Sequence, residues 1–489
     1  MKPLLACLTL LCAQPAAAFV DHSSTSLGGY ARLLARPDLA GGQGQLGFWN
    51  LYGRLLNEGP WISLDPRLAV LRKSSGAWSD LHLKFEGPGP LGADGSRGSL
   101  SAMRLTQAYL RAGTSQGSKH TVRVGSLSTW YGDLGLYDMR PARLFDGALG
   151  VAVEGRRANW SYLLGLGDAG YGLKGDAYNA VLNAGASLHY RNRHVVAGVG
   201  GEVRFEPSVA GKSTAPHATP GVAIEDLLRG EVVERFLEGR PGQEDFFPKP
   251  ETRDARSYAI VAELGFKAGR VIKWWQNFAR FERLHPQSPV QETHNGREFT
   301  IYLHDLSDER YQATLGSEIQ LQLIPKRLDL WIGAIGLWSS DEDNTVAPSD
   351  QSMQMLSGVA RAQWYLDSQW HLLVEGSIAS EHSVHGNRWR ATPRSIESNS
   401  GGQSDLRGLE YGDLDTRKTR QFKGGLLFSP RGRGLFARPV IRLLYGVQHS
   451  NQNNAFGNQF EQRESNENTF APVERRLHHL VALEAETWF

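Results

Sequence analysis

The final ten residues of the chain, 480–489, alternate between two kinds of side chain. Neighbouring side chains of a β-strand point to opposite sides, so odd and even positions form two faces. The odd face is largely apolar and consists of Val481, Leu483, Ala485, Thr487 and Phe489. The even face carries two carboxylates and consists of Leu480, Ala482, Glu484, Glu486 and Trp488. The pattern predicts either the closing strand of a membrane barrel or the last strand of a soluble sandwich.

The same two-residue period recurs in the middle of the chain. In residues 314–324 an apolar face alternates with a polar one that carries Glu318, and in residues 195–205 with one that carries Glu202 and Arg204. Such strands predict one face toward lipid and one toward a polar interior. Residues 328–338 are instead apolar on both faces. We interpret the inner face of this strand as covered by a loop that folds inward.

The connections between the predicted strands alternate between tight turns and long polar segments. Turns are predicted, for example, at residues 157–159, 191–193 and 325–326, whereas residues 206–256 and 381–420 are long connections. This asymmetry is typical of short periplasmic turns and long extracellular loops. The sequence therefore predicts an all-β fold, a transmembrane antiparallel β-barrel of about eighteen strands. The predicted strands are residues 27–36, 47–56, 61–71, 104–112, 121–127, 148–156, 160–167, 180–190, 195–205, 257–267, 271–284, 314–324, 328–338, 357–366, 370–380, 421–429, 440–449 and 480–489.

The N-terminus has the pattern of an export signal. A basic start at Lys2 leads into a short apolar run and then into Ala16-Ala17-Ala18. This predicts a signal peptide over residues 1–18 and export to the outer membrane of a Gram-negative bacterium. Residues 19–489 are predicted to form a single barrel domain. The two cysteines both lie in the predicted signal, which excludes a disulfide scaffold.

Composition supports this interpretation and excludes several others. The 489 residues include 53 basic and 51 acidic side chains, a net charge of +2, so nothing in the balance indicates a nucleic-acid partner. A hydrophobic content of 40%, without a long apolar run, excludes a helical membrane protein. The 55 glycines and the many Trp, Tyr and Phe residues are typical of tight turns and of aromatic belts at two membrane interfaces.

The sequence holds no recognisable catalytic or metal-binding motif. His449 and Ser450 are the one suggestive pair, but adjacent strand residues face opposite sides, so the imidazole cannot take the hydroxyl proton. The acidic run of residues 341–344 has calcium-ligand chemistry but lacks the glycine and the distal glutamate of a helix-loop-helix site. We therefore expect no enzyme activity, no cofactor and no resident metal.

Three short motifs resemble the maltoporin-type sugar porins. The first is Gly29-Tyr30-Ala31-Arg32, and the second is the run of residues 124–133 that continues to Tyr137 and Asp138. The third is the aromatic end Trp488-Phe489. The resemblance implies a homotrimer of eighteen-stranded barrels in outer-membrane lipid, through which sugars or oligosaccharides diffuse passively. It also implies a third loop, residues 128–147, that folds into the pore.

The resemblance carries over to individual residues. Tyr30 and Trp488 would belong to an aromatic track for sugar faces, and Arg32 and Asp138 to the polar lining. Tyr131 and Tyr137 would lie at the constriction, where they either contact sugar or pack the loop against the wall. The family has a lining arginine where this chain has Leu127, a departure that bears on maltodextrin specificity.

Two alternatives stay open from the sequence. The long segments 206–256 and 381–420 are compatible with an outer-membrane lectin or assembly protein that holds polysaccharide and is plugged by its own loops. For single residues, Trp488 is also compatible with an interfacial girdle position, and Arg32 with a general lumen cation. If the last strand meets residues 27–36, Tyr30 and Trp488 stand side by side, and the two ends of the chain build one part of the sugar path.

Overall fold

The computed structural model describes residues 25–37, 46, 52–87, 103–114, 120–137, 139–140, 142–170, 180–206, 255–284, 289–294, 297–302, 310–341, 353–382, 416–451 and 477–489. The predicted signal peptide, residues 1–18, lies outside them. The strands are β1 (Ser26–Ala35), β2 (Trp61–Arg72), β3 (Ala77–Gly87), β4 (Arg104–Thr114), β5 (His120–Ser126), β6 (Thr129–Tyr131), β7 (Ala142–Leu144), β8 (Leu149–Arg157), β9 (Trp160–Asp168), β10 (Leu182–Arg191), β11 (Val195–Glu206), β12 (Ala255–Ala268), β13 (Ile272–Leu284), β14 (Pro289–His294), β15 (Arg297–Tyr302), β16 (Arg310–Ile324), β17 (Leu328–Asp341), β18 (Met353–Tyr365), β19 (Trp370–His382), β20 (Thr416–Phe428), β21 (Val440–Ser450) and β22 (Leu477–Trp488).

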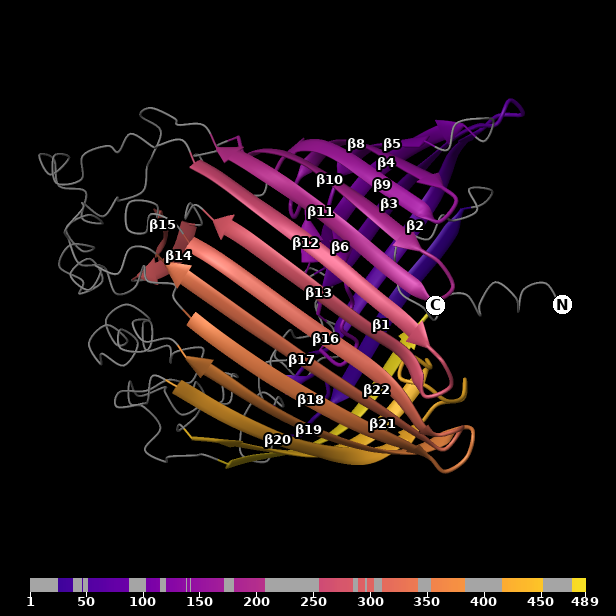
Figure 1. Cartoon of the computed structure of the whole chain (residues 1–489), viewed down its shortest axis with the longest axis vertical. Coiled ribbons are helices and arrows are strands. Elements are labelled where there is room, and N and C mark those ends of the chain that lie inside the picture. The colour runs from indigo at the N-terminus through magenta and orange to yellow at the C-terminus, as the bar shows by residue number, and fades with distance from the viewer. Residues whose placement is uncertain are drawn as a thin grey trace, which may run out of the picture.

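Eighteen of these strands close into one antiparallel barrel (Figure 1). Each strand pairs with the next along the chain, and β22 pairs with β1 to complete the ring. At this seam Gly29 and Phe489 exchange two backbone hydrogen bonds of 2.9 and 3.1 Å. The short pairs β6–β7 and β14–β15 stand apart from the ring. The predicted fold class and the predicted meeting of the last strand with the first are confirmed.

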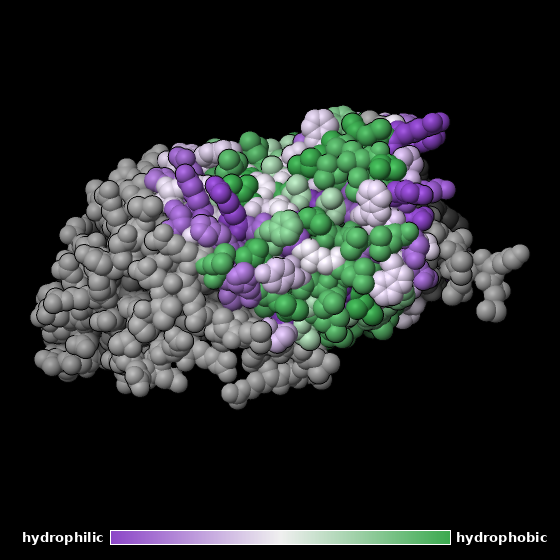
Figure 2. All heavy atoms as spheres, turned by 90° about the horizontal axis from the view of Figure 1, so that it is seen from below, coloured by the Kyte–Doolittle hydropathy of each residue, from purple (hydrophilic) through white to green (hydrophobic). Residues whose placement is uncertain are grey.

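The outer surface of the barrel is apolar around its middle. Side chains of the predicted lipid-facing set are exposed there, among them Val203 at 59%, Leu315 at 49% and Leu483 at 51%. Figure 2 shows the resulting hydrophobic band, with hydrophilic residues toward both ends of the described surface. In a closed barrel the backbone N–H and C=O groups of every strand pair with neighbouring strands, so a barrel with an apolar exterior is stable in lipid. The chain is therefore an outer-membrane β-barrel. Among the described residues no helix is long and apolar enough to cross a membrane.

Exposed tryptophans mark both borders of this band. Trp160 and Trp370 each begin a strand directly after a tight turn and are 48% and 43% exposed. Trp61 and Trp338, at 38% and 42% exposure, lie near the opposite strand ends, where the long connections begin. Aromatic residues at both strand ends match the two predicted interfacial belts.

The predicted number of barrel strands, about eighteen, agrees with the structure although one predicted strand is absent and one observed strand was not predicted. Residues 47–56 were expected to form a strand, but within their described part, residues 52–56, the chain turns and forms no strand of the barrel. The strand that was not predicted is β3, which pairs with β2 and β4. β1 consequently pairs directly with β2 rather than with residues 47–56.

Two segments fold inside the barrel and pack against its inner face. The first, inner segment 1, comprises the described residues 46 and 52–60. Its Leu55 and Leu56 form a buried cluster with Leu444 and Leu480 of β21 and β22. The second, inner segment 2, comprises the described residues of 127–148. Its Leu136 belongs to a buried cluster on β13, β17 and β18.

The inner face of β17 is covered as the sequence predicted. Trp331 and Ile335 point inward and are at most 1% exposed, packed in one cluster with Leu134 and Leu136 of inner segment 2. A strand that is apolar on both faces thus contacts lipid on one side and a loop on the other.

Two strand glycines give a matched test of the packing between neighbouring strands. A Cβ on Gly150 would lie 2.1 Å from the carbonyl oxygen of Leu166, which is backbone of the adjacent strand, whereas a Cβ on Gly376 meets nothing within 4 Å. We expect Gly150→Ala to lower the free energy of unfolding by about 1–3 kcal/mol, because the two backbones must separate. Gly376→Ala should leave it unchanged. Urea titration of refolded barrels in vesicles measures both, and equal stabilities would contradict the close approach at Gly150.

Candidate functional site in the barrel lumen

The aromatic pair expected from the sequence lies at the seam. Tyr30 and Trp488 are register partners in β1 and β22, and their ring centroids are 6.4 Å apart. The half-buried Trp488 ring also lies 6.4 Å from Phe436 and 5.2 Å from the Arg438 guanidinium, both in the turn between β20 and β21. These contacts place Trp488 inside the end of the barrel that carries the tight turns, rather than in the outer girdle. Burial lowers the pKa of Arg438 to about 10, which leaves it charged at neutral pH.

Arg32 faces the lumen but is covered by inner segment 1. It is 7% exposed and pairs with Glu58 of that segment, and it donates to the Gly59 carbonyl oxygen at 2.7 Å. The Tyr30 hydroxyl donates to Glu486 at 3.0 Å and accepts from Arg32 at 3.2 Å. The polar lining expected at Arg32 is therefore an internal ion pair that anchors an inward-folded segment.

A buried charge network extends from the seam along the last strands. Glu486 accepts from Arg54 at 2.9 Å, from Arg442 at 2.6 Å and from Arg438 at 2.8 Å. A second carboxylate, Glu375, holds Arg361 at 2.6 Å and Lys423 at 2.9 Å. All seven side chains are at most 6% exposed. The sequence predicted that Glu484 and Glu486 face inward, but not the arginines they bind.

The two tyrosines of inner segment 2 pack this segment against the wall. Tyr137 is fully buried, and its hydroxyl lies 3.3 Å from the Gly333 carbonyl oxygen and 3.2 Å from the Ser357 hydroxyl. Tyr131 is 4% exposed and stacks on His189 of β10 with a centroid distance of 4.2 Å. Burial raises the pKa of both hydroxyls, so both stay protonated at neutral pH. Asp138, the other predicted lining residue, lies outside the described residues.

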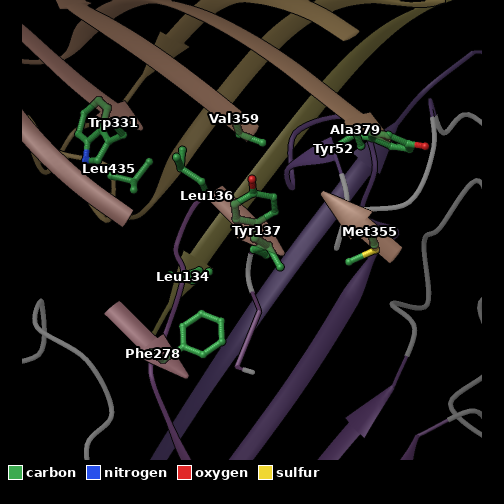
Figure 3. Packing of buried hydrophobic residues seen from close by; sticks show 11 residues of the cluster. Tyr52, Leu134, Leu136, Tyr137, Phe278, Trp331, Met355, Val359, Ala379 and Leu435 are labelled. Atoms are coloured by element: carbon green, nitrogen blue, oxygen red, sulfur yellow. The ribbon is translucent and has the colours of Figure 1, made fainter. Parts of the chain in front are cut away.

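The two inner segments meet in the middle of the lumen. The Arg54 amide of inner segment 1 donates to the Leu136 carbonyl oxygen of inner segment 2 at 2.8 Å. Figure 3 shows Leu134, Leu136 and Tyr137 surrounded by the inward side chains of the wall, with Tyr52 in the same cluster. Leu435, from the turn between β20 and β21, also belongs to it. Chain from three separate connections therefore shares one apolar core inside the barrel.

A second polar surface, the N-terminal wall, is the inner face of β2 to β5. Near the long-loop end, the Trp130 ring of inner segment 2 lies 5.7 Å from the Lys84 ammonium and 4.6 Å from the Arg140 guanidinium. Farther down, His82 hydrogen-bonds Asp65 through one ring nitrogen and the Tyr109 hydroxyl through the other. The sequence analysis did not predict this wall because it did not predict β3. The alternation within β3 indicates a strand nevertheless, since the polar residues Asp80, His82, Lys84 and Glu86 share one face.

Tyr109 of the N-terminal wall is surrounded by arginines. The Arg123 guanidinium carbon lies 3.9 Å from the centre of its ring, and that of Arg111 lies 6.0 Å away. Arg111 also donates two hydrogen bonds to the Asp80 carboxylate, of 3.1 and 3.0 Å. Arg67 stands 4.0 Å from the same carboxylate.

Neither metal nor nucleophile chemistry is assembled among the described residues. They contain no group of three or more His, Cys, Asp or Glu side chains placed to hold a metal ion. His449 is exposed on the outer face, whereas Ser450 points inward and lies 3.3 Å from Thr419, so the two have the opposite orientations that the sequence predicted. The acidic run 341–344 lies outside the described residues beyond Asp341.

The fold and its lumen define an outer-membrane β-barrel. No family model and no curated protein matches the chain. Among solved structures, the chain is similar to the outer membrane channel DcaP of Acinetobacter baumannii, with 10% identity, a TM-score of 0.42, and coverage of 95% of this chain and 97% of that one.

Two further similar structures have different stated roles. An anion-selective porin from Comamonas acidovorans is 9% identical with a TM-score of 0.38, and the match covers 95% of this chain and 99% of that one. Wzi of Escherichia coli, described as a carbohydrate-binding β-barrel, is 11% identical with a TM-score of 0.40, covering 94% and 83%. Likeness at this level concerns architecture alone. The maltoporin-type resemblance of the chain ends stays a prediction.

Proposed function

We propose that the barrel is an outer-membrane porin for the passive diffusion of sugars or oligosaccharides. The observation that carries the proposal is the half-buried Trp488 ring inside the barrel, next to Tyr30, Phe436 and the charged Arg438. A sugar presents an apolar face that packs on an aromatic ring and an edge of hydroxyls that bond to charged groups. Several weak contacts of this kind in series favour passage over retention. Assembly as a homotrimer is part of the same proposal and rests on the maltoporin resemblance alone.

Liposome swelling tests the proposed function. We expect vesicles that contain the protein to swell faster in sugar than in an amino acid of similar size. Trp488→Ala should reduce the sugar rate several-fold and leave the amino-acid rate unchanged, because it removes stacking area without closing the path. Trp160→Ala is the matched control, since that ring is 48% exposed on the outer surface. Equal swelling rates in sugar and in amino acid with the unaltered protein would contradict the proposed preference for sugars.

One observation favours a second candidate, an outer-membrane polysaccharide-binding or assembly lectin with a plugged barrel. The two inner segments meet at the hydrogen bond from Arg54 to Leu136 and share a buried core with the wall. In that case the inner segments would seal the lumen, and saccharide would be held at its surface. Single-channel recording separates the candidates, because a plugged barrel passes no steady current whereas a porin does.

A further inference from the structure

Three arginines gather around one tyrosine on the N-terminal wall. Arg67, Arg111 and Arg123 come from β2, β4 and β5, and together with Tyr109 they form what we call the arginine subsite. Arg123 covers the Tyr109 ring at 3.9 Å, and Arg67 and Arg111 approach the same oxygen of Asp80 at 4.0 and 3.0 Å. Like charges crowded in this way repel one another unless an anion lies between them.

The three arginines differ in how closely the described carboxylates of the wall approach them. Asp80 is bound by Arg111 through two hydrogen bonds, whereas Arg123 is 3.4 Å from Glu154 and Arg67 is 4.0 Å from Asp80. In the network around Glu486 the corresponding distances are 2.6 to 2.9 Å. The Nε atoms of Arg67 and Arg123 are buried and make no hydrogen bond within the described residues. The longer distances from Arg67 and Arg123 to their carboxylates leave these two guanidinium groups with capacity to bond further oxygen atoms.

The position of Tyr109 is fixed from the other side. Its hydroxyl bonds His82, which in turn bonds Asp65, and the His82 and Tyr109 rings are 4.5 Å apart. Asp65 points into the lumen with 40% of its side chain exposed, so the edge of the subsite reaches water inside the barrel. The group is therefore pre-organised, and it opens to the lumen at the Asp65 edge.

An aromatic ring borders the subsite. Arg123 lies 3.5 Å from the carbonyl oxygen of Ser128, and Trp130, two residues farther along inner segment 2, is flanked by Lys84 and Arg140. Guanidinium groups match the planar geometry of a carboxylate, and an indole matches the apolar face of a pyranose ring. Lys84, which lies by the Trp130 ring, follows His82 by two positions on the inward face of β3, so the ring and the subsite flank one strand.

We propose that the arginine subsite binds the carboxylate of an acidic sugar, so that the saccharides this barrel favours contain uronic acid. Arg67 and Arg123 supply the hydrogen bonds to the carboxylate, and Arg111, held by Asp80, adds positive charge behind them. Selection of acidic over neutral solutes for passage rests on the proposed function. Binding at the subsite does not.

Isothermal titration calorimetry of the detergent-solubilised full chain tests the subsite with four probes: glucuronate, glucose, acetate and inorganic phosphate. We expect glucuronate to bind more tightly than the other three. Arg123→Gln should weaken glucuronate binding about tenfold or more, since it removes charge-assisted hydrogen bonds to the carboxylate. Arg123→Lys, which keeps the charge but loses the planar fork, should give an intermediate affinity.

Arg143→Gln is the matched control, because this arginine lies on inner segment 2 with 60% of its side chain exposed and pairs with Asp146 at 3.1 Å. It should leave the glucuronate affinity unchanged. Phosphate binding as tight as glucuronate binding would overturn the sugar-acid assignment, and equal glucuronate affinities in Arg123→Gln and Arg143→Gln would overturn the subsite. If liposomes show no sugar passage while calorimetry still shows glucuronate binding that depends on Arg123, the porin proposal fails and the subsite stands.

Discussion

Replacing residues 128–147 with a short Gly/Ser linker is expected to raise the single-channel conductance several-fold. Inner segment 2 fills the middle of the lumen and meets inner segment 1 at the hydrogen bond from Arg54 to Leu136. Without such fillings, barrels of sixteen to eighteen strands leave an aqueous channel. The measurement is current through single barrels in a planar bilayer. A porin would show a small current before the replacement and a large one after it, whereas a plugged lectin would conduct only after it.

Tyr137→Phe is the control for this replacement. It removes the hydroxyl that lies near Gly333 and Ser357 but keeps the ring in its apolar cluster, so the conductance should stay at the unaltered level. Heat-modified mobility on gels establishes that each variant is a closed barrel. A closed, linker-bearing barrel with unchanged conductance would contradict the obstruction of the lumen by inner segment 2.

Glu486→Gln is expected to lower the free energy of unfolding by about 3–5 kcal/mol, the cost of leaving buried charges without their partner. Glu486 is 2% exposed and is the carboxylate on which Arg54, Arg438 and Arg442 converge. Glutamine keeps the shape but removes the charge, so the three guanidinium groups would then repel one another. Urea titration of the refolded barrel, followed by tryptophan fluorescence, measures the difference.

The comparison variant is Glu86→Gln on the N-terminal wall. Glu86 pairs with Lys84 at 2.6 Å, but 20% of its side chain is exposed, so water replaces much of the lost interaction. Its change in stability should stay near 1 kcal/mol or below, as for other ion pairs that water reaches. Equal effects of the two substitutions would show that burial of the Glu486 network does not govern its strength.

The alternation of apolar and polar residues along the strands predicted the barrel and its closure. It also predicted which strand side chains face lipid and which face the lumen. In β22 the apolar residues from Val481 to Phe489 face outward, and Glu484 and Glu486 face inward, because side-chain parity is a local property of any strand. Residues 47–56 misled the prediction because a chain that packs inside a barrel also needs apolar side chains. Leu55 and Leu56 are apolar because they contact Leu444 and Leu480, more than 380 residues along the chain, and no local pattern shows such a contact.

The candidate site was predictable only in part, for the same reason. Tyr30 and Trp488 were expected side by side from parity and closure, and they are register partners. The covering of Arg32 by Glu58 depends on how inner segment 1 folds back, which the sequence pattern does not specify. The arginine subsite was missed because its residues come from three strands, separated by a β3 strand that was not predicted. Its clustering exists only once β2 to β5 lie side by side.

Residues 328–338 of β17 expose two apolar faces until the barrel has formed. While the chain is still unfolded, neither the lipid that will meet Ile332 nor the inner segment that will cover Trp331 and Ile335 is in place. An unpaired stretch that is apolar on both sides self-associates more readily than one with a polar face. Before the barrel closes, residues 328–338 thus expose more apolar surface to self-association than residues 314–324, whose inner face is polar.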